Sequence, residues 1–384
     1  MRMKRMVAMM NYPPNTGNYS VGTACFSFVD DKRKETLGDA SGFRKIAVRM
    51  YYPVDSEQIV GKQHAQILSE EKTRLVKKAF RLKTLEGKWN IGEFYEQVLI
   101  STKEKFPLVL YSHGYNSYIE CNNCLCTELA SHGYIVASVG HAWESVRNEY
   151  EDGSADVYDK TISKKMYTSM FGALRAQMKL LKKDLSKEEA LEQLEQFQDK
   201  YCPFIKSRVG VWAEDLKAAL LQVKQRYADN LDLSHGVGAT GHSLGGCVAY
   251  YLAKYEPQIT CGINIDGGLF GEYDDTVMEK PFCQIGCREN ENVETRPLLH
   301  TKAPVYHVVF DRMKHIAFTD VKFFHTNKAL TGTLEPEKMH RSLAACHLNF
   351  FDEYLKGKAV DFEEGLAEGA ELLETINVEK RRLL

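Results

Sequence analysis

Four short, continuous apolar runs restrict the fold of this 384-residue chain more than any other feature. The runs are Phe106–Ser112, Tyr134–Gly140, Cys261–Asp266 and Pro304–Phe310. Apolar runs of this length, bounded by Gly, Pro or His, are typical of strands that are buried on both faces of a parallel sheet. A fifth run, Gly236–Thr240, consists almost entirely of small residues, and we place it in the sheet because of the motif that follows it.

Helical patterns alternate with these runs. Large apolar residues recur at steps of three and four in 170–185, in 212–227 and in 341–356. Strands that alternate with such helices require right-handed crossovers and predict a mostly parallel, doubly wound α/β sheet. Lys45–Pro53 alternates apolar and polar residues, which predicts a further strand with one wetter face, near a sheet edge. We expect residues 1–384 to form a single domain.

The segment 143–201 interrupts this alternation because it is long, charged and helical in pattern. We interpret it as a helical insertion over one end of the sheet. A solvated helical hairpin is one reading and a lid over a binding site is the other, since long insertions often carry function.

One motif carries chemistry. Gly241-His242-Ser243-Leu244-Gly245 matches the G-x-S-x-G nucleophile elbow, with a short strand before it and the apolar helical stretch Cys247–Tyr255 after it. A sharp strand-to-helix turn holds the serine in a strained conformation, so the positions two residues away on either side must lack Cβ atoms. The hydroxyl then lies at a helix N-terminus, which favours developing negative charge.

A serine hydroxyl becomes a strong nucleophile only when a base removes its proton and a carboxylate orients that base. In this fold the acid and then the histidine follow the serine along the chain. Asp266 ends the next strand and is our candidate acid, with Asp311 at the end of a later strand as its rival. His315, in the loop after the last predicted strand, is the candidate base, and His325 is the second choice.

The tetrahedral intermediate of ester cleavage also needs N–H donors for its oxyanion. We expect one donor to be the backbone N–H of Leu244 and the other to be that of Tyr115, in the loop after Phe106–Ser112. We interpret His113 in that loop as a bracing side chain rather than a catalyst.

These residues belong to stretches that resemble the platelet-activating factor acetylhydrolases and their bacterial relatives. The resemblance covers most of the chain in order, and its segments are 17–22, 49–53, 106–115, 130–141, 241–246, 263–268 and 315–320, the last being similar to the family's H-x-x-F-x-D. It implies an α/β-hydrolase fold and cleavage of short or oxidised acyl esters of phospholipids without calcium, and it supports Asp266 over Asp311. The chain departs from the family at Tyr115, at Leu244 and in the size of the 143–201 insertion.

The charge balance, the hydropathy pattern and the cysteine content argue against several other classes of protein. Fifty basic and 52 acidic side chains nearly balance, so we expect no nucleic-acid partner. No apolar run is long enough for a membrane helix, and the N-terminal 14 residues lack the apolar core of a signal peptide, so we expect no stable membrane insertion. The ten cysteines then indicate reduced thiols in a cytoplasmic protein. The sequence specifies no oligomeric state.

A thiolate zinc site is the remaining alternative for the cysteines. Cys121, Cys124, Cys126, Cys283 and Cys287 have spacings unlike paired C-x-x-C knuckles, and no histidine follows at ligand distance. We therefore predict neither a metal nor another cofactor.

The candidate residues together predict a serine-dependent carboxylic ester hydrolase that acts through an acyl-serine intermediate on a small-molecule ester or lipid. Two alternatives stay open. One is a binding protein that keeps the fold without turnover, and the other is an amide or peptide hydrolase that uses the same triad.

Overall fold

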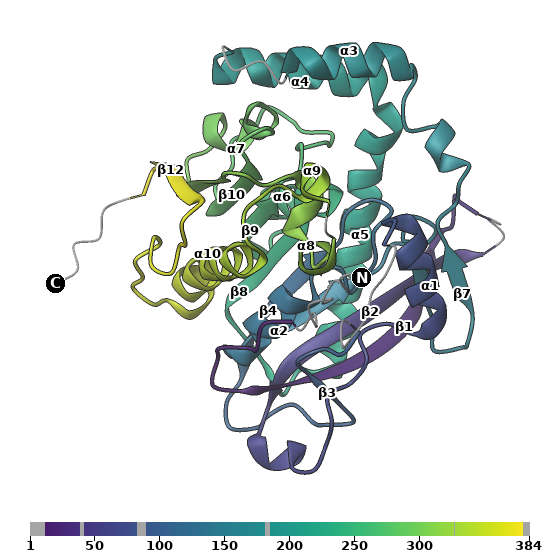
Figure 1. Ribbon diagram of the computed structural model, residues 1–384, viewed down its shortest axis with the longest axis vertical. Helices are drawn as coiled ribbons and strands as arrows, with labels where there is room; N and C mark the ends of the chain where they lie inside the picture. Colours follow the sequence, from purple (N-terminus) through teal and green to yellow (C-terminus); the bar gives the residue numbers. More distant parts are fainter. Residues whose placement is uncertain (1–11, 39–41, 83–89, 181–184, 326, 379–384) are drawn as a thin grey trace, which may run out of the picture.

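The computed structural model describes residues 12–38, 42–82, 90–180, 185–325 and 327–378. Within these residues ten strands form one sheet in the order β12-β11-β10-β9-β8-β4-β5-β2-β1-β3 (Figure 1). Their bounds are β1 Ser20–Lys34, β2 Phe43–Val54, β3 Tyr95–Glu96, β4 Phe106–Ser112, β5 Ile135–Val139, β8 Leu231–His242, β9 Ile259–Ile265, β10 Phe282–Cys287, β11 Val305–Phe310 and β12 Ala370–Ile376. A separate two-stranded sheet consists of β6 Arg147–Glu149 and β7 Ala155–Val157.

Helices connect and cover the strands. The α-helices are α1 Glu70–Ala79, α2 Asn123–Ser131, α3 Met170–Leu180, α4 Lys187–Tyr201, α5 Pro203–Arg226, α6 Leu244–Tyr255, α7 Arg296–Leu299, α8 Val321–Phe324, α9 Lys328–Thr331 and α10 Pro336–Lys356. Short 3₁₀ turns are η1 Ser56–Ile59, η2 Ile162–Lys164, η3 Glu291–Val293 and η4 His315–Phe318.

The centre of the sheet is parallel, from β5 through β4, β8, β9 and β10 to β11. Antiparallel pairing is confined to the two sides, where β2 joins β5 and β12 joins β11. The predicted mostly parallel, doubly wound sheet is therefore confirmed. Each of the five predicted runs overlaps one of these strands and extends beyond it by no more than one residue at either end.

Alternate side chains of the central strands enter two different cores, which explains why their sequences are apolar throughout. In β4, Val109 and Tyr111 pack with α2 and α10, whereas Leu108 and Leu110 pack with α5 and α6 on the other face. Catalytic and binding side chains are therefore expected at the carboxyl ends of the strands, outside the apolar cores.

The prediction for β2 was wrong in one respect. Arg49, assigned to a wetter face, is only 4% exposed. Its guanidinium lies 4.8 Å from the centre of the Phe94 ring and donates to the Ile67 carbonyl at 2.6 Å. The segment after η1, which carries Ile67 and Phe94, covers this face, and the Thr23 hydroxyl of β1 accepts from Arg49 at 3.2 Å. The Arg49 charge, which the pattern assigned to solvent, is therefore buried and paired.

The 143–201 insertion contains more than helices, because its first part forms the β6–β7 hairpin. Its α3 and α4 pack side by side along one end of the molecule, at the top of Figure 1. Two residues of the predicted periodic pattern in α3 do not face a core: Leu174 and Met178 are 57% and 66% exposed, and the neighbouring Phe171 is 80% exposed. Leu181, which we placed in the same pattern, lies outside the described residues.

Across the described chain no helix has both the length and the apolarity needed to cross a membrane. The N-terminal stretch that we assessed as a signal peptide lies largely in residues 1–11, outside the described part.

Candidate active site

Ser243 stands at the turn between β8 and α6 with φ 60° and ψ −122°, a conformation that non-glycine residues rarely adopt. Its N–H donates to the Ile265 carbonyl at 2.8 Å, which ties the turn to the end of β9. Local strain of this kind persists only where the surrounding structure enforces it. The serine is thereby held at the carboxyl edge of the sheet, at the first turn of α6.

The two glycines of the elbow are required by close backbone approach. A Cβ at Gly241 would lie 2.5 Å from the carbonyl oxygen of Ser112, and one at Gly245 would overlap the same carbonyl. The end of β4 therefore passes against both glycines. Any side chain there would push the elbow away from β4.

The structure brings the three predicted residues of the triad together. His315 Nε2 lies 2.9 Å from Ser243 Oγ, and His315 Nδ1 lies 2.6 Å from Asp266 Oδ2. The Asp266 carboxylate is fully buried, whereas 46% of the His315 side chain is exposed. A base that contacts both the hydroxyl and a buried carboxylate has the geometry of a Ser-His-Asp triad.

Two further donors hold Asp266, and sequence reasoning missed both. The Cys287 N–H donates to Oδ1 at 2.7 Å and the Asn290 amide donates to Oδ2 at 2.8 Å. Burial alone would raise the pKa of Asp266, but the hydrogen bonds from His315 and Cys287 outweigh it, so the pKa lies below its usual value. Asp266 is therefore ionised when it faces the imidazole.

His242 and Glu294 were also missed. His242 Nε2 donates to the His315 carbonyl at 2.9 Å, and its ring packs against the His315 ring with centres 4.6 Å apart. Burial, assisted by His315, lowers the pKa of His242 to about 3, so this ring is neutral. Glu294 is fully buried, and burial together with the Asp266 charge raises its pKa well above the usual value. A histidine inside the elbow motif was the available signal for His242.

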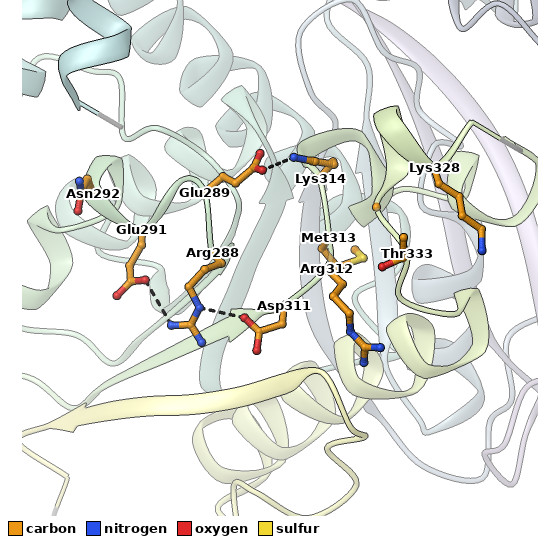
Figure 2. A pocket seen from close by; sticks show the side chains of 11 residues that line it. Arg288, Glu289, Glu291, Asn292, Asp311, Arg312, Met313, Lys314, Lys328 and Thr333 are labelled. Carbon is orange, nitrogen blue, oxygen red and sulfur yellow. Dashed lines mark hydrogen bonds and ion pairs between the residues drawn. The ribbon is translucent and has the colours of Figure 1, made fainter. Parts of the chain in front are cut away.

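The alternative acid, Asp311, and the alternative base, His325, interact with other residues instead. Asp311 forms an ion pair with Arg288 at 2.9 Å in an open cavity of about 1080 Å³ lined by charged side chains (Figure 2). Most of the labelled charges there pair with one another, including Lys314 with Glu289. The ring of His325 accepts from the Asn327 N–H at 3.2 Å and has no contact with Ser243.

The loop after β4 passes beside Ser243. A Cβ at Gly114 would lie 3.0 Å from Ser243 Cβ. Among the described residues, the N–H groups of Tyr115 and Leu244 donate to no protein acceptor, so both are available to a ligand oxygen. His113 braces this loop: its Nδ1–H donates to the Gly114 carbonyl at 2.7 Å, and its Nε2 accepts from the Ser145 hydroxyl at 2.8 Å.

The cysteines are free thiols, and all except Cys25 are buried. Burial raises the pKa of Cys121 to about 12, which disfavours the thiolate that binds metals. In the described part of the chain, no group of three or more His, Cys, Asp or Glu side chains is arranged to hold a metal ion.

Comparison with known proteins gives a consistent result. The model of the family described as platelet-activating factor acetylhydrolase, isoform II, matches residues 5–365. A platelet-activating factor acetylhydrolase of Cavia porcellus is 24% identical over 373 residues, which cover 89% of this chain and 78% of that protein. The corresponding protein of Bos taurus is 24% identical over 289 residues, which cover 72% of this chain and 59% of its own length.

A solved structure shares the fold. A ferulic acid esterase from Streptomyces cinnamoneus matches with a TM-score of 0.71 and 19% identity, covering 94% of this chain and 98% of that one. At this identity the likeness shows the α/β-hydrolase fold alone. The family model, in contrast, spans nearly the whole chain. The chain thus belongs to the platelet-activating factor acetylhydrolase isoform II family, and it is an ester hydrolase.

Proposed function

We propose that the chain cleaves carboxylic esters with Ser243 as the nucleophile, His315 as the general base and Asp266 as the residue that orients the imidazole. The observation that carries this proposal is the continuous hydrogen-bonded path from Asp266 Oδ2 through His315 to Ser243 Oγ, at 2.6 and 2.9 Å. Neither Asp311 nor His325 takes part in a comparable path.

The reaction follows from these contacts. Ser243 Oγ attacks the ester carbonyl carbon and its proton moves to His315 Nε2, while the carbonyl electron pair becomes an oxyanion. The N–H groups of Tyr115 and Leu244 stabilise that oxygen. Collapse of the intermediate breaks the bond to the alcohol, which leaves with the proton from His315. Water, deprotonated by the same imidazole, then attacks the acyl-serine and releases the acid and Ser243.

Asp266 holds a negative charge 2.6 Å from His315 Nδ1. Because its carboxylate stays ionised through its hydrogen bonds, it stabilises the imidazolium that forms on His315 during both proton transfers. The Nδ1–H bond to Asp266 also sets the tautomer that leaves Nε2 free to accept the Ser243 proton.

We assign the substrate to short-acyl esters, with phospholipids that carry a short or oxidised acyl chain as the first class to test. Membership in the acetylhydrolase family supports this assignment. The test is a panel of p-nitrophenyl esters from acetate to palmitate, run beside a phospholipid with a short second chain. We expect the highest kcat/KM on the shortest esters and release of the short acyl chain from the phospholipid. Turnover of p-nitroanilides in place of esters would instead favour the amide hydrolase.

Within a single domain of residues 1–384, we propose that 143–201 covers the acyl-binding side of this site. The support is its anchoring beside the triad: Gln198 donates to the carbonyl of Gly268, two residues after Asp266, at 3.0 Å, and Asn292 donates to the Leu180 carbonyl at 2.9 Å. The exposed apolar side chains of α3 are what a segment that meets an acyl chain would carry.

The variant Gln198→Ala tests whether the segment 143–201 covers the acyl-binding side of the site. Loss of this anchor should change KM for the long p-nitrophenyl esters at least threefold and leave acetate turnover nearly constant. Lys206→Ala, which removes an ion pair with Asp199 on the same helical unit, is the matched control. Equal KM values for all esters in Gln198→Ala and the native protein would refute a covering role.

A further inference from the structure

A second hydrogen-bonded chain of serine, histidine and aspartate lies inside the molecule, separate from the triad at Ser243. Ser112 Oγ lies 2.9 Å from His141 Nε2, and His141 Nδ1 lies 2.8 Å from Asp215 Oδ2. All three residues are completely buried. No substrate can reach this serine, so the arrangement needs an explanation other than nucleophilic catalysis.

The charges around Asp215 determine where the protons are. The carboxylate accepts two hydrogen bonds from Arg44, both at 2.6 Å, and one from Arg33 at 2.8 Å. Burial would raise the pKa of Asp215, but Arg44 and His141 outweigh it and the pKa lies well below its usual value. Burial lowers the pKa of His141, which is therefore neutral. Its Nδ1–H donates to Asp215, and its Nε2 accepts from the Ser112 hydroxyl.

Ser112 joins this chain to the reaction site. It is the last residue of β4, directly before His113-Gly114-Tyr115, and its carbonyl is the one against which Gly241 and Gly245 pack. A rotation of Ser112 would move both the loop that carries the Tyr115 N–H and the contact with the elbow. The hydrogen bond to His141 opposes that rotation.

Aromatic packing links the same histidine to Tyr115. The Trp212 ring stacks on the His141 ring with centres 3.7 Å apart and an interplanar angle of 7°. Trp212 also stacks on the Tyr115 ring, at 5.9 Å and 16°. Its indole N–H donates to Glu144 at 2.8 Å, and the Glu144 carbonyl accepts from the Asn116 N–H at 2.9 Å.

Two of these side chains come from α5, which packs against β4 and β5. Trp212 and Asp215, three residues apart, both point from α5 toward His141 and the loop. The loop beside Ser243 therefore rests on a buried network in which the side chains of Ser112, His141 and Asp215 are all hydrogen-bonded. Such networks hold a single geometry because any displacement leaves a buried polar group unpaired.

We infer that Ser112, His141 and Asp215 are positioning residues that fix the Tyr115 N–H in the oxyanion hole. The inference rests on the proposed function, since it assigns these residues to the transition state of ester cleavage. Removal of the Ser112 hydroxyl should displace the donor rather than delete it. We expect kcat/KM to fall about 10- to 100-fold, less than the loss of a donor usually causes.

Ser112→Ala is the test variant and Ser138→Ala is its control. Ser138 lies on the adjacent strand β5 and is equally buried. Its hydroxyl makes one hydrogen bond, to the Ile119 carbonyl at 2.7 Å, which lies four residues beyond Tyr115 rather than beside the Tyr115 N–H. Both variants are titrated with a fluorophosphonate to count reactive Ser243, and kcat and KM on p-nitrophenyl acetate are expressed per titrated site. Inhibition by a trifluoromethyl ketone, which forms a tetrahedral oxyanion on the serine, is measured alongside. His141→Phe, which keeps a ring on Trp212 but loses both hydrogen bonds, is the second test variant.

The inference predicts that in Ser112→Ala kcat per titrated site falls, KM stays within about twofold of native, and the inhibition constant of the ketone rises by the same factor as kcat/KM falls. Ser138→Ala should match the native protein in all three. Equal effects in the two serine variants, or a loss confined to the number of titratable sites, would overturn the inference while the proposed function stands. Native protein that fails to react with the fluorophosphonate would overturn both.

Discussion

Replacement of His315 by alanine gives the most informative prediction for the triad. The change removes the acceptor 2.9 Å from Ser243 Oγ and the partner 2.6 Å from Asp266. Loss of a triad base lowers turnover by about 10³ or more, which corresponds to about 4 kcal/mol of transition-state stabilisation. Asp266 keeps its hydrogen bonds from Cys287 and Asn290, so the buried carboxylate stays paired and the protein should fold.

The solvent exposure of the His315 side chain allows a rescue experiment. Because 46% of the His315 side chain is exposed, its removal leaves a space that is open to solvent, and added imidazole should restore part of the hydrolysis of p-nitrophenyl acetate. His325→Ala is the control and should retain native activity, since that ring accepts a hydrogen bond from the Asn327 N–H and takes no part in the path from Asp266 to Ser243. A decrease of less than tenfold in His315→Ala, or an equal decrease in His325→Ala, would show that another group acts as the base.

Three further predictions test the surroundings of the site. Asn290→Ala removes one donor from Asp266 and should lower kcat/KM on p-nitrophenyl acetate about tenfold, near the value of one hydrogen bond to a charged group; an unchanged rate would remove Asn290 from the account. Burial raises the pKa of Asp320, which accepts from the Cys124 N–H, to about 8. Since an unfolded aspartate has a pKa of about 3.9, the folded protein binds this proton more tightly, and its stability should fall as the pH rises from about 4 to 8. Thermal melts should show a smaller decrease over that range in Asp320→Asn, and parallel curves would contradict the assignment. Treatment with EDTA should leave ester hydrolysis unchanged, whereas strong inhibition that zinc or calcium reverses would indicate a metal requirement.

Sequence patterns predicted five of the six central parallel strands, because these strands are buried on both faces and are therefore largely apolar. They missed β10, whose sequence Phe282–Cys287 contains a glutamine and a glycine, and they missed β1 and β12, whose outer positions are polar and half exposed. The apolar period of α3 predicted a helix correctly but not its surroundings, since periodicity does not state what the apolar face meets.

The candidate triad was identifiable because a nucleophile elbow has a local signature and a fixed order of partners along the chain. The two further donors to Asp266 could not be identified from the sequence. The Cys287 donor is a backbone N–H, which any residue would supply, and Asn290 lies near Asp266 only after β10 is placed beside β9. The buried chain through His141 was hidden for the same reason. Ser112, His141 and Asp215 are scattered over 104 positions, and only the fold brings them into contact.

Reaction of the native protein with a fluorophosphonate, followed by peptide mass mapping, tests the central claim most directly. The account predicts a single phosphonylated residue, Ser243, and no labelling in Ser243→Ala. Labelling at another serine, or equal labelling of the variant and the native protein, would contradict it.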